Sequence, residues 1–311
     1  MAEPQRIKGV LAPVITPIKA DHTPDAERLI RHCKWVLAQD CGLAVFGTTS
    51  EANSFSVTER TAVLEALVSS DVDPARMMPG TGCCALSDSI QLTAHAVKLG
   101  CAGALMLPPF YYKDVSDEGL YRYYSEVVQR IGDARLRIYL YHIPPVSQVP
   151  ITLPLIERLL KAYPHTIVGM KDSSGNWNHT KAVLDAFGTS GFDVFAGTEA
   201  LLLATMRHGG AGCISATANI NPAAIHKLYR EWRTPDAAAQ QEALNRLRNT
   251  VATYPMIAAL KQVVAHYSGD PAWTRVRAPL VELTSEQAEN LIADLAMLAF
   301  TMPGLRQVIA P

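Results

Sequence analysis

A lysine at the end of an apolar run is the residue best suited to covalent chemistry in this sequence. Residues 167–171 read Ile-Val-Gly-Met-Lys, and the two-residue alternation of a strand places Ile167, Gly169 and Lys171 on one face. If that face is turned inward, poor hydration of the ammonium group lowers the pKa of Lys171 and leaves a neutral amine. A neutral amine attacks a ketone to form a Schiff base, although a lysine at a strand end can equally extend into solvent.

A tyrosine near the end of the preceding apolar run, residues 138–142, is placed to work with that lysine. Neighbouring strands lie about 4.8 Å apart, so the Tyr141 phenol can reach the Lys171 amine if the two strands are adjacent. A phenol with a pKa of about 10 transfers protons usefully only when it is tuned or relayed, and the hydroxyl of Thr48 or Thr49 can complete such a relay. The alternative for Tyr141 is an ordinary packing role.

Hydroxyl groups and phenols follow two other apolar runs. The Gly47-Thr48-Thr49 turn offers backbone N–H and hydroxyl groups that can hold the carboxylate of a 2-keto acid, but the same pattern occurs in simple strand-to-helix turns. Tyr111 and Tyr112 are adjacent phenols that either stack across a subunit interface or cover the opening of the site.

These residues belong to a repeated unit of an apolar run followed by a helix-length amphipathic segment. The eight runs are residues 9–18, 43–47, 77–81, 103–108, 138–142, 167–171, 193–197 and 212–216. This alternation predicts an α/β fold, an eight-stranded parallel β/α (TIM) barrel with the chemistry at the carboxyl ends of the strands. A doubly wound open sheet is the alternative, but no G-x-G-x-x-G motif follows the first run.

The last part of the chain has a helical pattern without further strands. Residues 236–253, 255–268 and 285–300 predict three helices. We therefore expect a catalytic barrel over residues 1–232 and a C-terminal three-helix extension over residues 233–311.

The composition of the 311 residues argues against several classes of function. Lys and Arg number 28 against 29 Asp and Glu, and no basic stripe predicts a nucleic-acid partner. No apolar run is long enough to span a membrane, and the N-terminus lacks a secretory pattern, so we expect a cytoplasmic protein. The cysteines form no C-x-x-C pair and the histidines are scattered, so we expect reduced thiols and no metal. The low charged fraction, 18%, indicates a large core or a subunit interface.

Five short motifs stand at the ends of the predicted strands. They are Gly47-Thr48-Thr49-x-Glu51, Pro109-x-Tyr111-Tyr112, Tyr141-x-x-Pro144, Gly169-x-Lys171-Asp172 and Gly209-Gly210-x-Gly212-x-Ile214-Ser215. With this ordered set the chain resembles the dihydrodipicolinate synthase and N-acetylneuraminate lyase family from about residue 9 to residue 295. The resemblance implies a β/α barrel, usually a homotetramer, that forms a lysine Schiff base with a 2-keto acid and uses no other cofactor.

The resemblance also implies catalytic roles. Lys171 would form the Schiff base, and Tyr141 would transfer protons beside it. Thr48 would link Tyr141 to Tyr112, and Tyr112 would reach in from a neighbouring subunit.

The residues implied to bind substrate include two departures from the family pattern. Thr49, with backbone N–H groups near Gly47, would hold the carboxylate of the keto acid, and Ser215 would lie near the variable part of the substrate. Val146 stands where the synthases carry an arginine for the carboxylate of their aldehyde substrate, and valine cannot form such a pair. Glu199 is followed by Ala200, so the acidic pair with which the neuraminate lyases bind a polyol is incomplete.

We therefore predict a carbon–carbon lyase, a class I pyruvate-dependent aldolase. It would reversibly cleave a 2-keto-3-deoxy or 4-hydroxy-2-oxo acid to pyruvate and an aldehyde. The alternatives are a 2-keto acid dehydratase or deaminase on the same lysine, a 4-hydroxy-tetrahydrodipicolinate synthase with an altered aldehyde site, and an idle paralogue that only binds a keto acid. Besides its small-molecule substrates, the expected partner is a second copy of the chain, in a homotetramer or homodimer.

Overall fold

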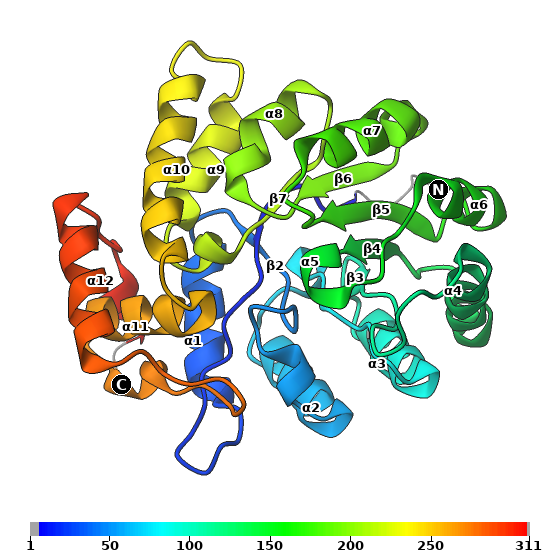
Figure 1. The fold of residues 1–311 in the computed structure, drawn as a ribbon. Coiled ribbons are helices and arrows are strands. Elements are labelled where there is room, and N and C mark those ends of the chain that lie inside the picture. The colour runs from blue at the N-terminus through cyan, green and yellow to red at the C-terminus, as the bar shows by residue number, and fades with distance from the viewer. Residues whose placement is uncertain (1–5, 310–311) are drawn as a thin grey trace.

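Seven short, buried strands form one parallel sheet in the computed structural model, which describes residues 6–309 (Figure 1). The strands are β1 (Gly9–Ala12), β2 (Gly42–Leu43), β3 (Ala104–Met106), β4 (Ile138–His142), β5 (Ile167–Asp172), β6 (Asp193–Ala196) and β7 (Gly212–Ile214). Their order across the sheet is β2-β1-β7-β6-β5-β4-β3, with every pair parallel. The near-continuous apolar composition of the strands fits a sheet that is covered on both faces.

The eighth predicted strand, residues 77–81, joins the sheet through single bridges rather than a continuous ladder. The Met78 N–H donates to the Leu43 carbonyl over 2.8 Å, and the Leu105 N–H donates to the Pro79 carbonyl over 2.9 Å. The segment is therefore bonded to β2 on one side and to β3 on the other, the two strands at opposite ends of the sheet order. The prediction of eight strands was too high by one, because this segment makes isolated contacts with each neighbour.

Helices surround the sheet, as Figure 1 shows. They are α1 (Ala26–Leu37), α2 (Val57–Ser69), α3 (Leu86–Lys98), α4 (Asp117–Ile131), α5 (Pro144–Ser147), α6 (Leu153–Ala162), α7 (Trp177–Phe187), α8 (Leu202–Arg207) and α9 (Pro222–Glu231). Local sequence explains where several begin. Ser56 and Glu59 form a capping box at α2, and the Ser116 hydroxyl caps α4. Within residues 6–309, no helix combines the length and apolar character that crossing a membrane requires.

The extension contains the three predicted helices and one more. They are α10 (Ala237–Ala252), α11 (Met256–Ser268), α12 (Ser285–Met297) and the short α13 (Leu305–Ile309). The prediction of three helices was therefore incomplete, because a five-residue helix is too short to show a period in the sequence. Leu291 of α12 and Leu305 of α13 share one apolar core with Leu29 and Val36 of α1. The extension thus packs directly against the first helix of the barrel.

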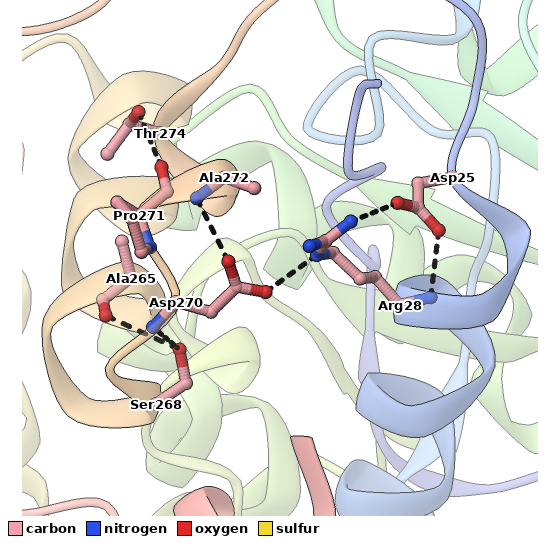
Figure 2. Close-up of polar contacts among 8 residues, drawn as sticks. All are labelled: Asp25, Arg28, Ala265, Ser268, Asp270, Pro271, Ala272 and Thr274. Carbon is pink, nitrogen blue, oxygen red and sulfur yellow. Dashed lines mark hydrogen bonds and ion pairs between the residues drawn. The ribbon is translucent and has the colours of Figure 1, made fainter. Parts of the chain in front are cut away.

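An arginine in α1 adds a polar link between these parts (Figure 2). The Arg28 Nε donates to Asp270 over 2.6 Å, and its Nη1 forms an ion pair with Asp25. The hydrogen bond to Asp270 raises the pKa of Arg28. Asp25 caps α1, and Asp270 accepts the Ala272 N–H at the start of the turn Pro271–Thr274. One guanidinium therefore joins the caps of two segments that are far apart in the sequence.

Candidate active site

Strand register sets Lys171 beside Tyr141. The two residues are direct partners in the parallel pairing of β4 and β5. Met170 packs among the residues between the sheet and its helices, so the alternation of β5 turns Lys171 to the inner face. The Lys171 Nζ donates to the Tyr141 Oη over 3.2 Å and lies 4.3 Å from the centre of that ring. Only 4% of Lys171 and 3% of Tyr141 are exposed, so this lysine does not extend into solvent.

Thr48 extends this chain of polar groups. Its hydroxyl oxygen lies 3.2 Å from the Tyr141 Oη. The turn that carries Thr48 is tight, because Phe46 and Glu51 on either side have φ angles of 59° and 60°. Left-handed backbone at two residues with side chains costs free energy and persists only where the surroundings enforce it. The predicted contacts from amine to phenol to hydroxyl are therefore present within one chain.

Gly47 and Thr49, on either side of Thr48, differ in what they contact. The Gly47 N–H donates to the Ser50 hydroxyl oxygen over 3.2 Å, so it is already engaged within the turn. Thr49 is half-buried, and together with Thr48 it lines a cavity of about 410 Å³. Thr49 thus borders open space, whereas Gly47 mainly shapes the turn.

A buried ion pair lies beside the threonine turn and was not anticipated. Lys261 of α11 and Glu51 at the end of the turn form it, and neither side chain has any exposed surface. The Lys261 Nζ also donates to the Arg275 carbonyl over 2.7 Å. Burial lowers the pKa of Lys261, and the negative charge of Glu51 opposes that shift. The only sign of this buried lysine in the sequence was its position among the apolar residues of α11. A lysine in a helix usually extends into solvent, so its burial was not predicted.

Arg277 attaches the same turn to the extension at a second point. Its backbone N–H donates to the Glu51 carboxylate over 2.8 Å, and its guanidinium donates to the Ser54 carbonyl over 2.8 Å. The guanidinium also binds Glu59 of α2 with both terminal nitrogens, at 3.0 and 2.7 Å. The hydrogen bond to Glu59 raises the pKa of Arg277. Residues of the C-terminal extension therefore hold the turn that carries Thr48.

Two residues predicted to bind substrate, Glu199 and Ser215, are hydrogen-bonded to each other. The Glu199 side chain is 2% exposed, and its carboxylate accepts hydrogen bonds from the hydroxyls of Ser215 and Thr217. The Nη1 atom of Arg248, a residue of α10, lies 3.0 Å from the same carboxylate. Ser215 has no exposed surface. Sequence reasoning missed Thr217 and Arg248, which together neutralise the acidic group expected to meet the substrate.

Val146 and Tyr112 lie at the surface of the single chain. Val146 of α5 is 62% exposed, and Tyr112 is 74% exposed. The Tyr112 ring packs edge-on against that of Tyr111, with 5.2 Å between centroids. The fold of one chain therefore leaves both side chains largely exposed to solvent.

A second cluster of polar side chains lies on the outer side of β4 and β5. Ligand atoms of His142, Asp172 and His179 lie within 4.8 Å of one another, and the two imidazoles stack 4.2 Å apart. The His142 Nδ1 accepts the Ile151 N–H over 3.0 Å, and burial lowers the pKa of His142 to about 4. The neutral ring thus carries its proton on Nε2, where it cannot ligate a metal.

Hydrogen bonds satisfy the carboxylate of this cluster. Burial tends to raise the pKa of Asp172, but bonds from His179, Ser174 and Thr180 outweigh it and lower that pKa. The His179 Nδ1 lies 2.8 Å from the carboxylate, and the Thr180 hydroxyl lies 2.7 Å from it. The donor set of this cluster therefore fits an internal hydrogen-bond network better than a cation site.

Comparison with known proteins identifies relatives along nearly the whole chain. The dihydrodipicolinate synthetase family matches residues 6–298, which confirms the predicted resemblance. A protein of Chloroflexus aurantiacus described as "Uncharacterized DapA-like lyase" is 33% identical over 296 residues, which are 94% of this chain and 96% of its own length.

Solved structures give the same result. Dihydrodipicolinate synthase from Agrobacterium tumefaciens C58 has a TM-score of 0.87 and 32% identity, over 94% of this chain and 99% of its own. YagE, a prophage protein of the same family from Escherichia coli K12, was solved with pyruvate. It has a TM-score of 0.86 and 25% identity over the same shares. N-acetylneuraminate lyase from Fusobacterium nucleatum is similar in fold, with a TM-score of 0.83 and 23% identity over 94% and 98%.

Proposed function

The chain belongs to the dihydrodipicolinate synthetase family, whose members are lyases and aldolases, and on that premise we propose a specific reaction for it. The enzyme cleaves a 4-hydroxy-2-oxo acid, such as a 2-keto-3-deoxy acid, to pyruvate and an aldehyde. The observation that carries this proposal is the buried Lys171 amine 3.2 Å from the Tyr141 phenol.

The first half of the reaction forms the Schiff base. The nitrogen lone pair of Lys171 attacks the C2 ketone, and proton transfer from nitrogen to oxygen gives a carbinolamine. Tyr141 then donates its proton to the departing hydroxyl, which leaves as water. The products of this step are a protonated imine on Lys171 and a phenolate on Tyr141, which accepts a hydrogen bond from Thr48.

The second half breaks the carbon–carbon bond. The Tyr141 phenolate takes the proton of the C4 hydroxyl, the C3–C4 bond breaks, and its electron pair forms the enamine while the aldehyde leaves. Tyr141 returns the proton to C3, which regenerates the protonated imine. Water attacks C2 as the phenolate takes its proton, and collapse of the carbinolamine releases pyruvate and the free Lys171 amine. The iminium is the electron sink, so the scheme needs no further cofactor.

The proposal also covers the domain division, the oligomeric state and the binding of the substrate carboxylate. Residues 1–232 act as the catalytic barrel, closed by the segment at residues 77–81, and residues 233–311 form the extension. The exposed Tyr112 enters the site of a neighbouring copy in a homotetramer or homodimer, which acts in the cytoplasm. Thr49 binds the carboxylate of the keto acid from its place beside Thr48.

A synthase activity is the second candidate. The similarity to dihydrodipicolinate synthase from Agrobacterium tumefaciens favours it, because the two chains are 32% identical. Against it, Val146 offers no group to bind the carboxylate of aspartate semialdehyde. A dehydratase or deaminase would share every step up to the enamine and would then expel a hydroxyl or an amine.

Trapping of the Schiff base tests the shared step. Pyruvate plus borohydride should add a reduced pyruvyl group to Lys171, identified by peptide mass. The adduct should be absent in Lys171→Ala and present in Lys181→Ala, since the Lys181 side chain is 44% exposed on the surface of α7. A well-folded wild-type enzyme without the adduct would reject the lysine chemistry. Free pyruvate from a 4-hydroxy-2-oxo acid then distinguishes the lyase from the dehydratase.

A further inference from the structure

The cavity beside the threonine turn has walls from three parts of the chain. Thr48 and Thr49 form one wall, and the start of α11 and the loop before α12 form the others. All of the residues that line it are Thr48, Thr49, Pro255, Met256, Ile257, Ala258, Pro279, Leu280 and Val281. At about 410 Å³, it has room for a small organic group.

This cavity adjoins the catalytic pair through a shared side chain. The Thr48 hydroxyl lies 3.2 Å from the Tyr141 Oη, and that oxygen lies 3.2 Å from the Lys171 Nζ. A substrate bound covalently to Lys171 would have its C4 hydroxyl near Tyr141. The rest of its chain can therefore extend past Thr48 into the cavity. From this continuity we propose that the cavity receives the aldehyde half of the substrate, and that this half is an uncharged apolar chain or aromatic ring. The inference rests on the function proposed above.

The chemistry of the walls determines the class of aldehyde. None of the described residues that line the cavity carries a charge, and apart from two hydroxyls their side chains are apolar. Thr49 is assigned to the carboxylate at C1, and beyond the two threonine hydroxyls the described residues of the walls offer no polar side chain. A second carboxylate or a polyol moved there would lose water without gaining matching partners, which costs free energy. An apolar group gains free energy from the same transfer.

The acidic group that could have bound a polyol is already satisfied. Glu199 accepts hydrogen bonds from Ser215 and Thr217 and pairs with Arg248. A sugar-like chain would have to displace these partners from the carboxylate of a buried residue. Two features therefore disfavour a polyol substrate. Within the described part of the chain, the cavity walls offer no polar side chain beyond the two threonines, and the Glu199 carboxylate is already hydrogen-bonded within the protein.

The cavity is held in shape by the ion pairs around it. Lys261, in the same helix as Met256, binds Glu51 at the end of the threonine turn. Arg277, two residues before Pro279, donates its N–H to the same carboxylate. Because one buried carboxylate is bonded to both other walls, the space is preorganised for an apolar group.

The first experiment compares three substrates that share the reacting atoms. They are 4-hydroxy-2-oxo-4-phenylbutanoate, 2-keto-3-deoxygluconate and 4-hydroxy-2-oxoglutarate, with released pyruvate measured through lactate dehydrogenase. We expect kcat/KM for the phenyl compound to exceed both others by about 100-fold. Equal or better values for the polyol or the dicarboxylate would overturn the inference.

Variants at the edge of the cavity test its location. Val281 is 72% exposed, so Val281→Asp and Val281→Arg should fold normally. Both should lower kcat/KM for the phenyl compound at least about 10-fold, and only Val281→Arg should raise it for 4-hydroxy-2-oxoglutarate. Met297→Asp, on the 79% exposed Met297 of α12, is the matched control and should change neither value. Identical effects of both Val281 variants on all three substrates would place the aldehyde half elsewhere.

Borohydride trapping separates this inference from the proposed function. Pyruvate lacks the aldehyde half, so its adduct with Lys171 should form at the wild-type rate in both Val281 variants. Trapping without the expected substrate preference would overturn the assignment of the cavity alone. Failure of trapping in the wild type would overturn the proposed function, and the substrate assignment with it.

Discussion

Replacement of Lys261 by methionine should strongly destabilise the protein and loosen the threonine turn. Lys261→Met keeps most of the buried side-chain volume but leaves the Glu51 carboxylate without its cation. That side chain has no exposed surface, and its remaining partner is the Arg277 N–H at 2.8 Å. Removal of one member of a buried pair typically costs about 3–5 kcal/mol. With an unfolding entropy of roughly 2.1 cal/mol/K per residue, this corresponds to a fall in Tm of about 5–8 °C for a chain of this length.

The assay combines unfolding with ligand affinity. Urea and thermal unfolding give the stability change, and the pyruvate dependence of borohydride trapping reports whether the keto acid still binds at the site proposed beside Thr49. Lys181→Met removes an exposed ion pair with Asp185, one helical turn away, and should cost less than about 0.5 kcal/mol. The double variant Glu51→Gln/Lys261→Met should lose at least about 1 kcal/mol less than the sum of its single variants. If Lys261→Met were no more damaging than Lys181→Met, the reasoning about the buried pair would be wrong.

Three further perturbations test other parts of the structure. Tyr141→Phe should lower kcat by about 10²–10⁴-fold and should slow, without abolishing, formation of the pyruvate adduct, and wild-type turnover would refute its role in proton transfer. Burial lowers the pKa of His32 to about 4, whereas the unfolded chain has the ordinary value of 6.5, so the unfolded state binds this proton first as the pH falls. The free energy of unfolding should therefore decrease from about pH 6.5 to pH 4, and His32→Gln should flatten that slope in urea titrations; an unchanged slope would contradict this. Gly212→Ala should cost at least about 3 kcal/mol, because φ is 141° and a Cβ would lie 1.9 Å from the Gly9 carbonyl oxygen. Gly188→Ala is its control, since a Cβ there meets nothing within 4 Å, and equal stability of the two variants would argue against the clash.

The sequence was sufficient to predict the two strands that carry Lys171 and Tyr141. Alternation placed Lys171 on the face opposite Met170, and the spacing of parallel strands predicted that Tyr141 could reach the amine if that face was turned inward. Both follow from local geometry that repeats in every sheet. The register shift near Ile138 was not predicted, and it places Ile167 in the same apolar cluster as Met170. The motifs then indicated the family, which the comparison confirmed.

Contacts between distant parts of the chain could not be predicted in the same way. Glu51 stood in a motif and Lys261 stood alone among apolar residues, but neither position indicated that the two side chains would pair. Glu199 was expected to face the substrate, and the sequence did not show that Arg248, in another helix, would neutralise it. Such pairings depend on how the extension packs on the barrel, which hydrophobic periodicity does not specify.

The attachment of the threonine turn to the extension has a consequence during protein synthesis. Arg277 follows Glu51 by 226 residues, so a ribosome working at roughly 5–20 residues per second makes it about 10–45 s later. For that interval the nascent chain carries an acidic group whose partners do not yet exist, while Lys171 and Tyr141 emerge before them. The threonine turn beside Tyr141 is therefore anchored late in synthesis, when translation reaches the region that follows the barrel.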